Sequence, residues 1–89
     1  MAIIRKHVFI KGRVIGVFFR KFIVDNANNL GLKGWVKNSG SGVECVFEGN
    51  SEKVERMIEL CKKGPSGAGV DSVDARDEPV QNEKGFKRV

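Results

Sequence analysis

The sequence contains few of the residues that build disulfide frameworks and metal centres. Among its 89 residues are two cysteines, Cys45 and Cys61, and one histidine, His7. The cysteines are too far apart for a Cys-x-x-Cys motif, and the histidine has no second ligand near it in the sequence. Both cysteines fall at apolar positions, so we expect buried free thiols. We expect His7 to be an ordinary residue on the surface of a strand, and we predict no metal site and no cofactor.

Long apolar runs are also missing. No stretch approaches the roughly 20 apolar residues that a membrane-spanning helix needs, and residues 1–7 contain no apolar run long enough for a signal peptide. We therefore expect a cytoplasmic protein that makes no contact with a membrane. With 40% apolar and 30% charged residues the composition is that of a globular protein, and the chain length predicts one domain, residues 1–89.

The net charge of +5 favours an anionic partner. Nucleic acid, a membrane surface and a small phosphorylated molecule all satisfy this condition. The sign of the charge does not choose among them, so the choice depends on motifs.

Hydrophobic periodicity indicates strands and helices in a clear order. Alternation of apolar and polar residues predicts strands at 4–11, 32–38 and 43–48, a weaker strand at about 70–76 and a last short strand at 85–89. Apolar residues at helical spacing predict one helix from Phe19 to Leu30 that ends at Gly31, and another from Asn50 or Ser51 to about Cys61. The segment 39–42, Ser-Gly-Ser-Gly, is predicted to be a four-residue hairpin loop.

This order predicts an α+β fold. With right-handed crossovers, the pattern β-α-β-β-α-β gives a ferredoxin-like sandwich, in which a four-stranded antiparallel sheet carries two helices on one face. The same fold hosts many unrelated functions, so the function has to be argued from a site.

The loop Lys11–Arg20 carries the strongest chemical signal. Gly12 and Gly16 allow a tight turn or positive φ, so that successive backbone N–H groups can converge on one anion. The N-terminus of the following helix and Arg20 would add donors at the same place. The alternative is a common glycine-containing turn followed by a solvated surface arginine.

Two long motifs in this chain resemble those of a known family. Residues 12–20, Gly-Arg-Val-Ile-Gly-Val-Phe-Phe-Arg, fit eight of the nine positions of the pattern Gly-x-Val-Gln-Gly-Val-x-Phe/Tyr-Arg. Residues 34–38, Gly-Trp-Val-Lys-Asn, and 43–49 form the second motif, and Gly64-Pro65 and Gly85-Phe86 also fit. The chain is similar over nearly its whole length to the acylphosphatases, small ferredoxin-like enzymes that hydrolyse the carboxyl–phosphate bond of acyl phosphates.

The resemblance implies a site that needs no metal and no cofactor. The backbone N–H groups of a loop would cradle the phosphoryl group of a small acyl phosphate, or inorganic phosphate or a similar anion, and Arg20 would bind its oxygens. Asn38 would hold the attacking water, and the phosphate of the substrate would take the proton. The predicted loop residues are Ile15, Gly16, Val17, Phe18 and Phe19. We expect the protein to act as a monomer.

Some residues admit a second interpretation. Taken alone, Asn38 at the edge of a hairpin is typical of a turn former. Trp35 and Lys37 lie near it and could contact the acyl group, although a tryptophan in a small sheet usually packs against its neighbours. The aromatic residues of the first helix are explained by core packing.

The chain departs from the family pattern at three places. Ile15 stands where glutamine is usual, the hairpin after Asn38 is one residue shorter, and Arg88 occupies a position in register with Phe86 where an aliphatic residue is expected. The first two departures leave a second hypothesis open, an inactive interaction module derived from the family.

A third hypothesis is RNA binding, because RNA-recognition domains share this topology and the chain is basic. Arg13 and Ile15, however, stand where the RNA-recognition motif needs aromatic rings, and the stretch follows the first strand instead of forming the third. We expect no nucleic-acid partner.

Overall fold

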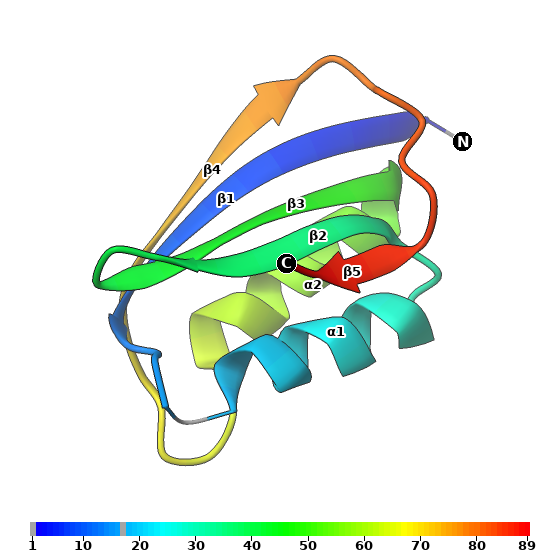
Figure 1. The fold of residues 1–89 in the computed structure, drawn as a ribbon. Coiled ribbons are helices and arrows are strands. Elements are labelled where there is room, and N and C mark those ends of the chain that lie inside the picture. The colour runs from blue at the N-terminus through cyan, green and yellow to red at the C-terminus, as the bar shows by residue number, and fades with distance from the viewer. Residues whose placement is uncertain (1, 17) are drawn as a thin grey trace.

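The fold has two layers, a five-stranded sheet and a pair of helices that cover one face of it (Figure 1). The structure is a computed structural model that describes residues 2–16 and 18–89. In chain order the elements are β1 (Ile3–Arg13), α1 (Phe19–Asn29), β2 (Lys33–Ser39), β3 (Gly42–Asn50), α2 (Ser51–Lys63), β4 (Gly69–Glu78) and β5 (Phe86–Arg88). The strands are ordered β4-β1-β3-β2-β5 across the sheet. The predicted ferredoxin-like α+β arrangement is confirmed.

The sheet differs from the prediction in having a fifth strand and a mixed direction. The pairs β1–β4, β1–β3 and β2–β3 are antiparallel, whereas β5 runs parallel to β2. The Gly34 N–H donates to the Gly85 carbonyl at 2.9 Å, and the Val89 N–H donates to the Val36 carbonyl at 2.8 Å. These bonds satisfy backbone groups on the outer side of β2 that would otherwise be an open sheet edge. The short strand predicted at 85–89 is present as β5, but the predicted four-stranded sheet did not include it, because its parallel pairing with β2 joins segments far apart in the sequence.

Residues near the predicted boundaries begin and end both helices. Gly31 follows α1 with φ +70°, and its N–H donates to the Asn28 carbonyl at 3.1 Å. Asn50 caps α2, since its side-chain oxygen accepts the Glu52 N–H at 2.9 Å. The glycine end of α1 and the asparagine start of α2 are thus confirmed.

The core lies between the sheet and the helices. α1 contributes Phe19, Ile23 and Ala27, α2 contributes Val54, Met57, Ile58 and Cys61, and the inner faces of β1, β2 and β3 contribute Val8, Ile10, Val36, Val43, Cys45 and Phe47. Both cysteines are buried and free, as predicted. Burial raises the pKa of the Cys45 thiol well above its ordinary value, and the contact with Cys61 adds to this effect.

β1 is longer than its hydrophobic pattern indicated. It continues past residue 11 to Arg13 and pairs there with β4 after a register shift between Lys11 and Gly12. Gly12 has φ +128°, and a Cβ at this position would collide with the backbone of Gly69 in β4. Only glycine fits this close approach. The loop before α1 is therefore shorter than the predicted stretch from Lys11 to Arg20.

The hairpin between β2 and β3 has a two-residue turn, Gly40–Ser41, instead of the predicted four-residue loop. Ser39 and Gly42 still pair across the strands, and Gly40 adopts φ +61°. A two-residue turn is common in hairpins because it matches the twist of the strands. The extra pairing keeps Asn38 inside β2 and fixes its direction.

None of the helices in residues 2–16 and 18–89 combines the length and apolar character needed to cross a membrane. The cytoplasmic location and the monomeric state stay predictions, as does the absence of a nucleic-acid partner.

Candidate active site

The loop between β1 and α1 turns with backbone conformations that are uncommon outside glycine. Val14 is buried at its start, and its N–H donates to the Gly12 carbonyl at 3.0 Å. Gly16 has φ +78° and Phe18 has φ +59°. A bulky residue in the left-handed region is strained, and such strain persists where a site requires a particular backbone shape. The predicted loop residue Val17 lies outside the described residues.

The N-terminus of α1 carries no side-chain cap. Phe18 occupies the N-cap position and makes no capping hydrogen bond, and the first turn of the helix contains no acidic residue. The first N–H groups of a helix lack partners within it, and the helix dipole makes this end positive. Phe18 is 81% exposed, so its ring is not packed into the core. The start of α1 therefore offers hydrogen-bond donors and positive potential to an anion.

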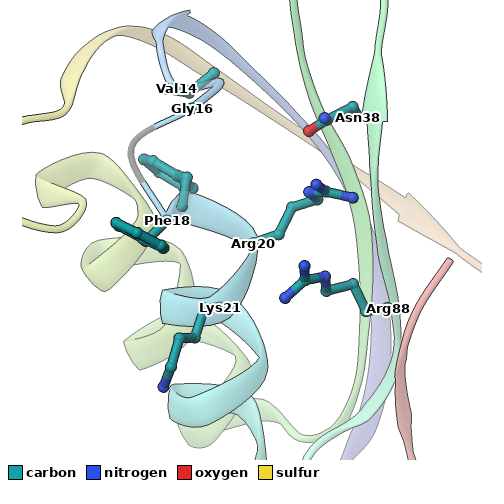
Figure 2. Close-up of a pocket in the computed structure, with 8 residues that line it drawn as sticks. Val14, Gly16, Phe18, Arg20, Lys21, Asn38 and Arg88 are labelled. Carbon is teal, nitrogen blue, oxygen red and sulfur yellow. The ribbon is translucent and has the colours of Figure 1, made fainter.

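A cavity of about 350 Å³ lies beside this helix start (Figure 2). The residues that line it belong to the loop, to the first turn of α1, to β2 and to β5. The lining residues are Val14, Gly16, Phe18, Phe19, Arg20, Lys21, Asn38 and Arg88. Segments far apart in the sequence thus meet at one place.

Arg20 and Asn38 reach the cavity from the two layers of the fold. Arg20 is the second residue of α1, and Asn38 stands in β2 opposite Val43 of β3. Because side chains alternate along a strand, Asn38 shares the helix-covered face with the fully buried Val36. In Figure 2 the Asn38 amide and the Arg20 guanidinium are turned toward the same space. The structure brings together these two predicted residues.

The same alternation places Trp35 and Lys37 on the opposite, open face of the sheet. Trp35 meets the ring of His7 edge-on with centroids 5.6 Å apart, and Lys37 lies over the Trp35 ring at 5.6 Å. Neither residue lines the cavity. The suggestion that they contact an acyl group is not supported, and the packing interpretation of Trp35 is confirmed.

Positive charge in the cavity is not neutralised by the protein itself. No carboxylate is among the lining residues. Of the three lining cations, Lys21 forms an ion pair with Asp25 at 2.7 Å, whereas Arg20 and Arg88 form none with any residue in 2–16 and 18–89. Two guanidinium groups therefore face a shared space without a counter-ion from the described chain.

The segment 79–85 leads into β5 and so determines where Arg88 lies. The buried carboxylate of Glu48 holds this segment in place. Glu48 of β3 accepts the backbone N–H groups of Gln81 and Glu83, both at 2.7 Å. Arg5 is 5% exposed and contacts Glu48 at 3.4 Å, Glu78 at 3.0 Å and Glu83 at 2.7 Å. This network joins β1, β3 and β4 to the chain that leads into β5.

The network makes folding depend on pH. Burial opposes ionisation of Glu48, but the N–H groups of Gln81 and Glu83 and the Arg5 guanidinium outweigh it and hold the pKa of Glu48 below 4.5. Hydrogen bonds from His7 and then Arg5 lower the pKa of Glu78 in the same way. A carboxyl with a lower pKa in the folded state stabilises the fold above its unfolded pKa, and this stability is lost as the pH falls through the folded pKa.

We expect Glu48→Gln to lower the free energy of unfolding at pH 7 by about 2 kcal/mol, since it weakens hydrogen bonds made by a charged group. Urea unfolding from pH 7 to pH 3 should show a wild-type stability that falls as the pH drops below about 4.5. The free energy of unfolding of Glu48→Gln should fall less than that of the wild type between pH 7 and pH 3. Equal acid slopes in the two proteins would contradict the role given to Glu48.

Comparison with known proteins agrees with the geometry. The family model described as Acylphosphatase matches residues 6–88. An acylphosphatase of Roseiflexus sp. (strain RS-1) is 47% identical over 91 aligned positions, which cover 100% of this chain and 98% of the relative. The chain belongs to the acylphosphatase family. This is a family of hydrolases.

Solved acylphosphatase structures have the same fold as this chain. The acylphosphatase of Coxiella burnetii superimposes with a TM-score of 0.94 at 34% identity, and covers 98% of this chain and 93% of its own. The acylphosphatase of Bacillus subtilis gives a TM-score of 0.94 at 28% identity, with coverage of 97% and 98%. Both matches cover nearly the whole chain.

Three residues that line the cavity are not among the predicted site residues: Val14, Lys21 and Arg88. Val14 belongs to the first motif, and Lys21 is the neighbour of the predicted Arg20. In the sequence Arg88 stands out only as an exception to an apolar register. In the structure it is exposed and lines the cavity, while Phe86 stacks on Phe47 with centroids 5.6 Å apart. A cationic residue that interrupts an apolar register was the signal for Arg88.

His7 differs from its expected role as a plain surface residue. Its Nδ1 lies 2.7 Å from a Glu78 oxygen and its Nε2 lies 2.7 Å from a Glu44 oxygen, on the open face of the sheet. The ring also stacks on Phe9 with centroids 4.7 Å apart. Within residues 2–16 and 18–89 no group of three or more His, Cys, Asp or Glu residues is placed to hold a metal ion.

Proposed function

We propose that this chain hydrolyses acyl phosphates to a carboxylate and inorganic phosphate. Its membership of the acylphosphatase family supports the reaction. The observation that carries the site assignment is the convergence of an uncapped helix N-terminus, Arg20 and Asn38 on one cavity. The backbone N–H groups of the loop Ile15–Phe19 and the Arg20 guanidinium bind the phosphoryl oxygens.

The proposed step is a displacement at phosphorus. Asn38 accepts a hydrogen bond from a water molecule through its side-chain oxygen and positions it. The water oxygen forms a bond to phosphorus, and the bond from phosphorus to the carboxyl oxygen breaks with its electron pair remaining on the carboxylate. The proton of the water passes to an oxygen of the phosphoryl group. The step needs no general base from the protein.

Electrostatic stabilisation provides most of the rate enhancement in this proposal. Phosphoryl transfer requires little covalent help, because its main demands are position and the neutralisation of charge on the phosphoryl oxygens. Donors that are already fixed where this charge develops cost no reorganisation during the reaction. The positive φ of Gly16 and of Phe18 supports such an arrangement of donors in the loop.

Ile15 does not weaken this proposal. Its side chain is 44% exposed and is not among the residues that line the cavity. Replacement of a glutamine there leaves the backbone N–H available. No observation on the described chain favours an inactive interaction module over an enzyme.

We expect the purified chain to hydrolyse benzoyl phosphate, with loss of its ultraviolet absorbance, at a rate that excess EDTA does not change. Inorganic phosphate should inhibit competitively because it resembles the group held by the loop. Hydrolysis no faster than in an enzyme-free control would refute the proposed function. Loss of activity in EDTA that added Mg²⁺ restores would refute the metal-free mechanism.

A further inference from the structure

Arg88 has no role in the proposed hydrolysis. The loop and Arg20 already provide donors for the phosphoryl group, and Asn38 provides the contact for water. Arg88 nevertheless lines the same cavity from β5, and it pairs with no carboxylate in residues 2–16 and 18–89. A second unpaired guanidinium beside Arg20 raises the positive potential in the cavity. The two guanidinium groups also repel each other unless an anion lies between them.

The position of Arg88 separates it from the phosphoryl end of the cavity. Figure 2 shows the loop with Gly16 on one side and Arg88 on the other, with the Arg20 guanidinium between them. If the phosphoryl group is held by the loop and Arg20, the acyl part of the substrate extends away from the loop, toward β5. Arg88 is therefore placed to meet the acyl part.

The fold holds Arg88 in this place although the side chain is exposed. β5 is anchored on β2 by backbone hydrogen bonds on either side of it, and Phe86 stacks on the fully buried Phe47. Glu48 fixes the preceding segment through two backbone N–H groups. The guanidinium therefore extends from a strand that is fixed at both ends, which lowers the conformational cost of binding.

We propose that Arg88 selects acyl phosphates whose acyl part carries a second anionic group, a carboxylate or a second phosphate. This inference rests on the proposed function and adds a substrate class to it. A guanidinium forms paired, charge-assisted hydrogen bonds with either group. An acyl phosphate with an uncharged acyl part forms no such bonds and gains only from the positive potential that Arg88 adds to the cavity.

The test compares substrates that differ in a single carboxylate. The kcat/KM for 3-carboxybenzoyl phosphate and for 4-carboxybenzoyl phosphate is divided by the kcat/KM for benzoyl phosphate, in the wild type and in Arg88→Met. The two isomers place the carboxylate at different points around one rigid ring. We expect Arg88→Met to lower this selectivity ratio about five- to tenfold for at least one isomer, which is less than a full charge-assisted hydrogen bond because Arg88 is exposed to solvent. Hydrolysis of benzoyl phosphate should fall by a clearly smaller factor than hydrolysis of that isomer, because only the potential of the cavity changes for it.

Lys87→Met is the matched control. It removes one positive charge from the same strand, but neighbouring side chains on a strand point to opposite faces, so Lys87 is turned away from the cavity. Its selectivity ratio should equal that of the wild type, and Arg88→Lys should retain part of the ratio. The wild-type ratio should also fall as ionic strength rises from about 0.01 M to about 1 M, since screening shortens the reach of the charge.

The outcomes separate the inference from the function on which it rests. Failure of the wild type to hydrolyse any of the three substrates would refute the proposed function. If the wild type is active and Arg88→Met slows all three substrates by one factor, Arg88 acts on the phosphoryl group and the inference is wrong. A selectivity ratio in Arg88→Met equal to that of the wild type for both isomers would also show that the inference is wrong.

Discussion

Arg20→Ala is expected to lower kcat/KM for benzoyl phosphate by about 10²–10³, the usual loss when one fixed donor to a developing charge is removed. Arg20 sits in the first turn of α1 and lines the cavity without an ion pair to any residue in the described chain. Its charge is thus available to a phosphoryl group. Initial rates at several substrate concentrations, with inorganic phosphate as a competing ligand, give both the loss of rate and the loss of anion affinity.

The control for this variant is Lys21→Ala. Lys21 is the adjacent residue and also lines the cavity, but its ammonium group is paired with Asp25 at 2.7 Å. We expect Lys21→Ala to remain within about threefold of the wild type, the effect of one exposed and already paired charge. A rate for Arg20→Ala within tenfold of the wild type would remove Arg20 from the site.

Asn38→Ala is expected to lower kcat by about 10² and to leave KM nearly unchanged. A residue that positions only the attacking water acts on the chemical step, and misplacement of a reactant by about 1 Å costs about this much. Asn38 is exposed in β2, so its removal should leave the stability of the fold nearly intact. Steady-state kinetics at saturating substrate, together with urea unfolding, separates these effects.

Two further variants sharpen this test. Asn38→Asp keeps the shape of the side chain but adds a negative charge next to a phosphoryl group, so its KM should rise as well. Ser39→Ala changes the adjacent residue of β2, which points to the other face of the sheet, and should behave as the wild type. A rise in KM without a fall in kcat for Asn38→Ala would mean that Asn38 binds the substrate and does not orient water.

Local sequence was sufficient to predict most of the fold. Glycine after α1, asparagine before α2 and apolar residues at helical spacing fixed both helices near their observed ends. Alternation fixed the inner face of β3, where Cys45 and Phe47 are buried. These signals are local, since each depends on residues that are close together in the sequence.

The parts that sequence did not predict depend on contacts between distant segments. The strand at 85–89 was visible in the sequence, but its place in the sheet was not, because its backbone bonds to β2, about 50 residues earlier, and no local pattern encodes this pairing. The extension of β1 to Arg13 similarly depends on β4 and on the glycine that lets them approach. The shorter hairpin turn follows from the pairing of Ser39 with Gly42.

The candidate site shows the same division. The loop and Arg20 are contiguous in the chain, so their motif was visible, whereas Asn38 was included only through the family resemblance. Arg88 reaches the cavity through the parallel pairing of β5, and its contribution depends on tertiary structure alone. The cluster around His7 likewise needs Glu44 and Glu78 from two neighbouring strands.

The most direct test of the proposed mechanism is hydrolysis of benzoyl phosphate in ¹⁸O-labelled water, with mass spectrometry of both products after a short reaction in EDTA. We predict catalysed turnover in which one ¹⁸O atom enters each inorganic phosphate and none enters benzoate, because the water positioned by Asn38 attacks phosphorus. Label in benzoate, or turnover no faster than without the protein, would contradict the account.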